Sequence, residues 1–127
     1  MDRPRVVTGE ELANPSEEQS AGMQRGQAFA HEGVWAGFAT FPAGASTGWH
    51  HNAGYATYAY ITSGVMTVES GPGGRDVVEV HEGDFVHIPA GLIHRESVSA
   101  DGAGGAVVRV GGTGATVVNV EGPEPAG

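Results

Sequence analysis

The sequence predicts an all-β domain, either a sandwich or a barrel, made of about nine or ten short strands. Glycine accounts for 22 of the 127 residues, which suits many tight turns and does not suit long helices. From Phe29 onward, strand-like segments are broken by glycine or proline at intervals of roughly 8–12 residues. After residue 28 no segment shows the sustained 3.6-residue apolar period of an amphipathic helix.

The first 27 residues differ from the rest of the chain and are predicted to form an N-terminal arm, residues 1–27. Val6–Thr8 can form a short strand, whereas the acidic segments Glu10–Leu12 and Ser16–Gln19 can each hold one helical turn. Such an arm either stays mobile or adds an edge strand to its own sheet or to that of a partner. The sequence leaves both possibilities open.

Residues 28–121 are predicted to form the barrel, and residues 122–127 a flexible tail rich in proline and glycine. Each expected strand is a β-branched or aromatic run that stops at a turn sequence such as Ser63-Gly64 or Gly71–Gly74, and a loop is expected at 101–105. The strands expected in this part are Val34–Phe41, Tyr55–Thr62, Val65–Glu69, Asp76–Val80, Phe85–Ile88, His94–Val98, Ala106–Val110 and Thr116–Val120.

Length and composition exclude several classes of protein. A chain of 127 residues is long enough for one domain with a single core. It has no cysteine, which excludes disulfides, Cys-ligated zinc and iron–sulfur clusters, and no lysine, which excludes Schiff-base catalysis. The net charge of −9 argues against a nucleic-acid partner. Without a signal peptide or an apolar run near the roughly 18 residues of a membrane helix, we expect a soluble, cytoplasmic protein without a membrane partner.

Two histidine-containing segments carry most of the chemistry of this chain. The first begins at Gly44 and reaches His50-His51-Asn52 after five residues. Residues two apart on a strand point the same way, so His50 and Asn52 would share a face, with His51 on the other. If that face is the inside of a barrel, His50 and Asn52 look inward. The second segment is a Pro89-x-Gly91 turn that leads to His94 and can direct this imidazole into the same interior.

Together the two segments resemble the two sequence motifs of the cupin family, over roughly residues 34–120. The second motif is nearly complete, whereas in the first Asn52 stands at the position of the second histidine and Thr57 at that of the glutamate. The resemblance implies a double-stranded β-helix, or jelly-roll barrel, preceded by the N-terminal arm. It also implies a metal site formed by His50, Asn52 and His94, with an amide oxygen as a weak third ligand and no carboxylate at Thr57.

The histidines can be interpreted in three ways. They can hold a divalent metal ion, with zinc favoured and iron, nickel or manganese as alternatives. They can form a metal-free pocket as acid/base or hydrogen-bonding groups, or they can be structural. His51 and His87 are the candidate acid/base residues, and the expected substrate pocket contains Trp49, Thr57 and Tyr58.

The resemblance implies a small-molecule-binding protein and, by family default, a homodimer. Small single-domain cupins include zinc-dependent polyketide cyclases, dioxygenases, isomerases and sugar- or ligand-binding modules, and a histidine-rich site without a carboxylate resembles the cyclases more than the isomerases. A cyclase would use the metal to polarise a carbonyl and a histidine to move a proton. The alternatives are a non-heme iron dioxygenase and a metal-free or non-catalytic cupin that binds or senses a ligand.

Overall fold

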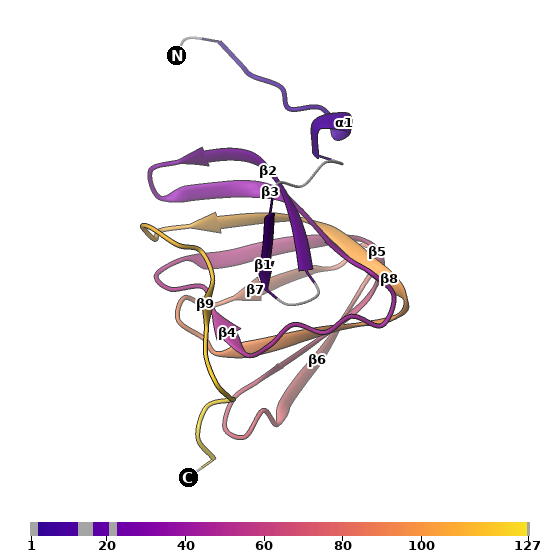
Figure 1. Ribbon diagram of the computed structural model, residues 1–127, viewed down its shortest axis with the longest axis vertical. Coiled ribbons are helices and arrows are strands. Elements are labelled where there is room, and N and C mark those ends of the chain that lie inside the picture. The colour runs from indigo at the N-terminus through magenta and orange to yellow at the C-terminus, as the bar shows by residue number, and fades with distance from the viewer. Residues whose placement is uncertain (1–2, 13–16, 21–22, 127) are drawn as a thin grey trace.

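The computed structural model describes residues 3–12, 17–20 and 23–126, and the fold in these ranges is all-β apart from one helical turn (Figure 1). The fold class predicted from the sequence is therefore confirmed. In chain order the elements are α1 (Gly9–Leu12), β1 (Glu17–Ser20), β2 (Met23–His31), β3 (Val34–Phe41), β4 (His50–His51), β5 (Ala56–Ser70), β6 (Asp76–His81), β7 (Phe85–Ile88), β8 (His94–Val110) and β9 (Val118–Asn119).

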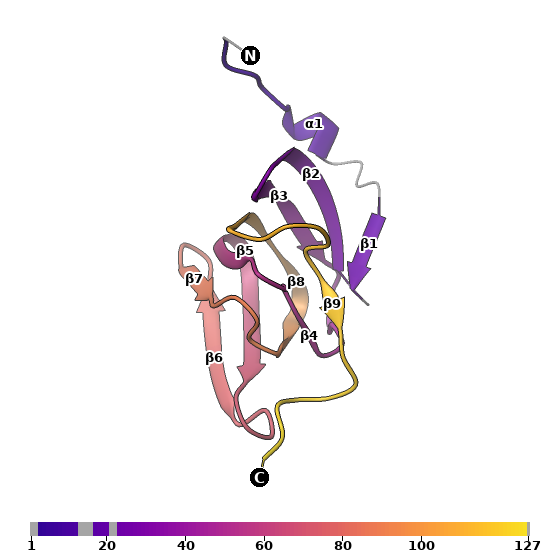
Figure 2. The ribbon, with the colours of Figure 1, turned by 90° about the vertical axis from the view of Figure 1, so that its left-hand side faces the viewer.

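Two long strands, β5 and β8, pair with each other antiparallel along most of their length and take part in both walls of the barrel. The first half of β5, residues 56–61, and the second half of β8, residues 103–110, belong to a sheet with the order β1-β2-β3-β8-β5-β7. Their other halves, 65–70 and 94–98, belong to a sheet with the order β6-β5-β8-β4-β9. The resulting sheet is strongly curled, as the two views show (Figures 1 and 2).

Glycine allows β5 and β8 to bend without reversing. Gly64 has a φ of 77° and Gly102 a φ of 77°, and a Cβ at position 64 would overlap the carbonyl oxygen of Gly102. The expected turn at Ser63-Gly64 and the expected loop at 101–105 are therefore wrong, because both stretches stay within strands. The pairing shifts register at this point, which is how the chain passes from one sheet to the other.

The interior between the two sheets is filled by apolar side chains from both of them. Trp35 and Phe41 come from β3, Ile61 and Met66 from the two halves of β5, and Val107 from β8. Side chains alternate along each strand, so every second residue points into this interior, and at a few of these positions the residue is polar. Those positions form the site described below.

The N-terminal segments only partly follow the sequence-based expectations. Glu10–Leu12 lies in a helical turn as predicted, and Thr8 and Glu11 cap it by exchanging backbone–side-chain hydrogen bonds of 3.2 and 3.3 Å. Val6–Thr8 lies outside any strand, and Glu17–Ser20 is a strand rather than a helical turn. Since β2 begins at Met23, the sheet starts within the segment that the sequence analysis assigned to the arm.

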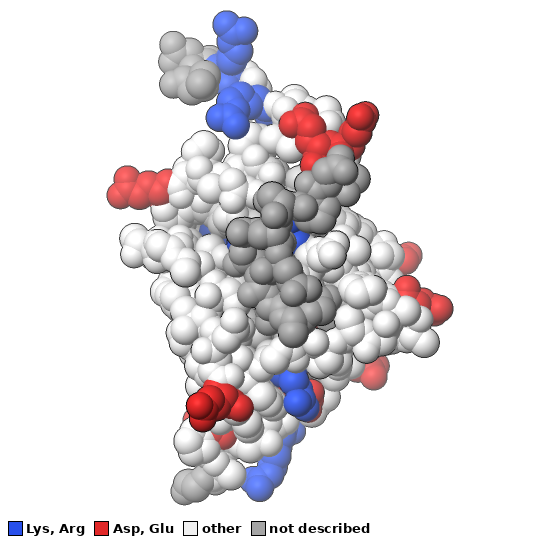
Figure 3. Space-filling view, in the orientation of Figure 1, with Lys and Arg blue, Asp and Glu red and all other residues white. Residues whose placement is uncertain are grey.

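The segment after β9 contacts the β5–β6 hairpin at Glu124. Gly73 donates a backbone hydrogen bond of 2.8 Å to Glu124, so the tail is attached at least as far as this residue. Acidic side chains are spread along the margins of the face shown in Figure 3, and arginines lie mainly near its two ends. Within the described part of the chain, no helix has the length and hydrophobicity to cross a bilayer.

Candidate metal centre

His50, His94 and Glu96 meet inside the barrel on the wall that contains β4 and β8. Strand pairing places His50 directly opposite His94, and Glu96 lies two residues further along β8 on the same face. The Nε2 atoms of His50 and His94 lie 3.0 and 3.5 Å from Oε1 of Glu96. The two imidazoles are fully buried and Glu96 is only 9% exposed. Their ligand atoms all lie within 4.8 Å of one another.

Both imidazoles are oriented by the backbone of their own strand. Nδ1 of His50 donates to the carbonyl oxygen of Gly48 at 2.9 Å, and Nδ1 of His94 donates to that of Leu92 at 2.8 Å. A carbonyl only accepts hydrogen bonds, so the proton of each neutral ring is on Nδ1 and the lone pair is on Nε2. Metal-binding histidines are usually oriented in this way, by a hydrogen bond that keeps the proton on the ring nitrogen that does not bind the metal.

The spacing of the three ligand atoms suits a divalent metal ion. Atoms bound at about 2.0–2.2 Å from one ion are themselves about 3.0–3.6 Å apart, which matches the distances of 3.0 and 3.5 Å from Oε1 of Glu96 to the Nε2 atoms of His50 and His94. Although Nε2 of His50 is close to Glu96, it has no hydrogen-bond partner among the described residues. A buried nitrogen with a free lone pair beside a carboxylate is what a shared cation would explain. The residues present therefore fit a metal.

The same proximity changes the acidity of the cluster in the absence of a metal. Burial raises the pKa of Glu96, but its interactions with His50 and His94 outweigh burial and hold this pKa well below its usual range. Burial lowers the pKa of His50, yet the neighbouring carboxylate of Glu96 outweighs it and leaves the pKa above the ordinary value. Glu96 is thus ionised at neutral pH, the state that a metal ligand requires.

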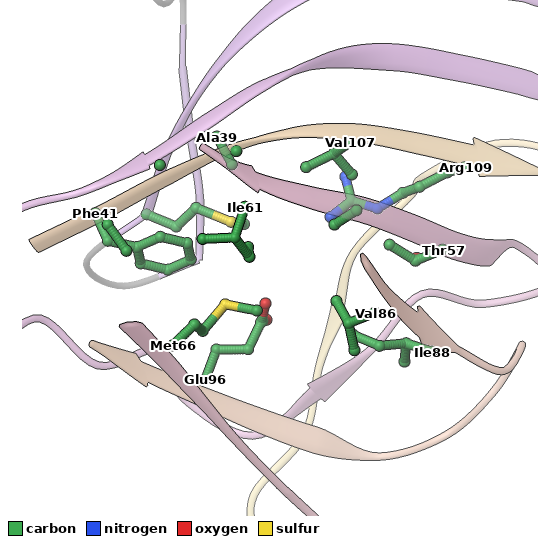
Figure 4. Close-up of a pocket in the computed structure, with 15 residues that line it drawn as sticks. Ala39, Phe41, Thr57, Ile61, Met66, Val86, Ile88, Glu96, Val107 and Arg109 are labelled. Carbon is green, nitrogen blue, oxygen red and sulfur yellow. The ribbon is translucent and has the colours of Figure 1, made fainter. Parts of the chain in front are cut away.

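A cavity of about 30 Å³ begins at Glu96 and extends between the two sheets (Figure 4). Its lining is apolar except for Thr57, Glu96 and Arg109. Glu96 reaches it from one sheet, whereas Arg109 and Thr57 come from the other, where they are paired neighbours. The carboxylate of Glu96 and the guanidinium of Arg109 both point into this space (Figure 4).

The structure brings His50 and His94 together, as the sequence analysis expected, and also buries Asn52 nearby. Asn52 already has protein partners at both ends of its amide. Its Nδ2 donates to the Thr116 carbonyl at 2.8 Å, and its Oδ1 accepts a hydrogen bond of 3.3 Å from Thr57. Asn52 thus links the β5 wall to the segment before β9. Thr57 is among the residues that line the cavity.

The other candidate residues lie outside this cavity. His51 accepts a hydrogen bond of 3.0 Å from the backbone of Ala53. His87 and Tyr58 stack on each other at 4.8 Å on the exposed outer face of β5 and β7, since alternation turns them away from the interior. Trp49 lies beneath the guanidinium of Arg95 at 4.6 Å and is not among the residues that line the cavity. None of the four therefore faces the cluster's cavity.

Sequence reasoning missed two residues, Glu96 and Arg109. The expectation of a site without a carboxylate is wrong, because Glu96, two residues after His94, places one beside both imidazoles. The signal was the spacing His94-x-Glu96, which places both side chains on one face of a strand. Arg109 gave a weaker signal, an arginine between valines in the last long strand, and only the pairing with Thr57 shows which way it points.

Comparison with known proteins agrees with this architecture. The chain is similar in structure to oxalate decarboxylase from Bacillus subtilis, with a TM-score of 0.69 and 20% identity over 94% of this chain and 34% of that one. An RmlC-like cupin from Shewanella frigidimarina gives a TM-score of 0.65 and 18% identity over 85% and 91% of the two chains. The EutQ protein of Clostridium difficile gives 0.60 and 17% over 84% and 80%.

These likenesses concern the fold, and this chain spans about a third of the length of the oxalate decarboxylase. No curated protein matches it. The cupin domain model matches residues 37–112, which contain both histidine segments, Glu96 and Arg109. With both motif histidines facing one barrel interior and this match over more than half of its length, the chain belongs to the cupin family.

Proposed function

We propose that this protein binds a divalent metal ion through His50, His94 and Glu96 and uses it to act on a small molecule in the barrel interior. The observation that carries the proposal is the arrangement of three buried ligand atoms around one point, with both Nδ1 atoms already bound to backbone carbonyls. The chemistry that such an ion supplies is the polarisation of a substrate oxygen. The cavity next to Glu96 is the place for that substrate.

Two histidines and one carboxylate with open positions are typical both of catalytic zinc and of non-heme iron. Glu96 therefore removes the argument for a cyclase that rested on a site made only of histidine and amide. It also favours the second candidate function, an iron-dependent dioxygenase, because a carboxylate completes the ligand set of that class.

Metal analysis of the purified protein tests the proposal. Cells supplied with zinc, iron, nickel and manganese should yield protein with stoichiometric metal, and His94→Ala should lose it. His81→Ala is the matched control, since His81 is also paired with a glutamate, at 3.2 Å, but on the surface. Unchanged metal content in His94→Ala would refute the ligand assignment. Bound iron together with substrate-dependent oxygen uptake would favour the dioxygenase over a zinc enzyme.

We further propose that two copies associate through the outer face of β5, β7 and β8. Tyr60 and Phe85 contact each other there at 4.8 Å and are 38% and 77% exposed. Tyr58 and Val108 extend the same face. Exposed apolar side chains that lie next to one another in this way are a common feature of protein–protein interfaces and support this one.

A further inference from the structure

Arg109 is a buried cation that forms no ion pair with a carboxylate of the described residues, although the charge of Glu96 attracts it from across the cavity. It is 5% exposed, and its Nε and Nη1 atoms have no hydrogen-bond partner among the described residues. Nor does an ion pair join it to any carboxylate in the part of the chain that the structure describes. A buried polar group without a partner costs free energy, and a buried charge costs more. A bound ligand that brings a negative charge and hydrogen-bond acceptors would offset this cost.

Two interactions partly compensate for the burial of Arg109, the charge of Glu96 and a contact with Trp35, and neither gives its Nε or Nη1 atom a hydrogen bond. The guanidinium carbon of Arg109 lies 5.3 Å from the centre of the Trp35 ring, an attraction between the charge and the face of the ring. Burial outweighs the attraction of Glu96 and lowers the pKa of Arg109 to about 10, which still leaves the side chain charged at neutral pH. The positive charge and at least two hydrogen-bond donors therefore remain available inside the barrel.

The surroundings define what these donors can bind. Arg109 lines the same cavity as Glu96, on the opposite sheet, and its nitrogens point into that space (Figure 4). Apart from Thr57, the remaining lining consists of apolar side chains and backbone, for example Phe41 and Val86. A ligand here would have an anionic group for Arg109 and a small apolar body, because the cavity measures only about 30 Å³. Guanidinium binds planar carboxylates especially well, through paired hydrogen bonds.

We propose that Arg109 is a substrate-binding residue that selects a small carboxylate and anchors its anionic group in the cavity opposite Glu96. This inference rests on the proposed function for the orientation of the ligand, since it places the other end of the carboxylate toward the metal cluster. The binding of the anion to Arg109 itself does not require a metal. The two proposals can therefore fail separately.

The test is a titration with acetate at constant ionic strength, with acetamide as the neutral isostere. A Trp49→Phe background leaves Trp35, which contacts Arg109, as the only tryptophan and hence as the fluorescent reporter. We expect saturable binding of acetate and an affinity at least about tenfold lower for acetamide. Arg109→Gln should lower the affinity for acetate at least about tenfold, and Arg109→Lys should lower it less. Arg75→Gln, at an exposed arginine, is the control and should bind as the parent does.

The titration is run on both metal-loaded and chelator-treated protein. Equal responses to acetate and acetamide in the parent protein would overturn the inference even if Arg109→Gln does not fold. Binding of sulfate in place of acetate, with the same dependence on Arg109, would overturn the assignment to a carboxylate. Protein that takes up no metal but binds acetate through Arg109 would refute the proposed function alone. Metal-loaded protein that does not respond to acetate would refute this inference alone.

Discussion

Replacement of Glu96 by glutamine tests the metal centre most directly, because it keeps the shape of the side chain and removes only its charge. Oε1 of Glu96 lies 3.0 and 3.5 Å from the two imidazole Nε2 atoms, so it is the one anionic ligand of the cluster. An ion held by the wild type at a free concentration about 100-fold above its Kd stabilises the fold by about 2.7 kcal/mol. For a domain of this size that corresponds to an increase in Tm of about 10 °C.

Loss of the carboxylate should weaken metal binding at least about 100-fold, since even groups that only support a ligand contribute about 10- to 100-fold. At the same metal concentration the variant would then be about half saturated, and the stabilisation would fall to about 0.4 kcal/mol, or about 2 °C. The assay is thermal unfolding followed by circular dichroism, with and without zinc, manganese, nickel or ferrous iron. Chelator-treated samples give the baseline for each variant.

Glu79→Gln is the matched control, because Glu79 also pairs with a histidine, His81, but both side chains are mostly exposed. It should keep the full metal-induced increase in Tm. A Glu96→Gln variant that also keeps the full increase would refute the role of this carboxylate. A wild type that none of the four ions stabilises would refute the metal centre itself.

Three further predictions concern acidity, the bend in β5 and assembly. The pKa of His50 is raised in the fold, so this group stabilises chelator-treated protein below its unfolded-state pKa, and the contribution is lost as pH rises through the folded-state pKa. The drop in Tm from pH 6 to pH 9 should therefore be larger in the wild type than in Glu96→Gln. Gly64→Ala should destabilise the fold by about 2 kcal/mol or more, because its Cβ would overlap the Gly102 carbonyl at a positive φ, whereas Gly122→Ala, with open space around it, should unfold at the wild-type temperature. In light scattering, Phe85→Glu should convert a dimer into a 12.9-kDa monomer; dissociation by Val6→Glu instead would place the interface on the arm.

The general architecture was predictable because the second histidine motif is nearly complete and glycine- or proline-containing turns recur at regular intervals. The two long strands were not, because glycine in a sequence signals a turn equally whether the chain reverses or only bends. Gly64 and Gly102 bend strands that continue to pair on both sides, and only the partner strand decides between the two outcomes.

For the site, the position of each histidine in its motif identified His50 and His94, and local spacing was sufficient. The spacing from His94 also predicts that Glu96 shares its face, but the family motif places its glutamate at the position of Thr57 and so directs attention away from Glu96. His87 shows a different limitation. Side chains alternate along a strand, so His87 and Phe85 share a face, but the sequence does not say whether this face is the interior. That depends on long-range pairing with β5.

A single strand, β8, carries two of the three proposed ligands near its start and the proposed carboxylate anchor near its end, with the bend at Gly102 between them. If a ligand spans these two ends as proposed, its length would be set by the curvature of this one strand rather than by the relative movement of separate elements. Substitutions near this bend would change the preferred length of the ligand without replacing any side chain that contacts it.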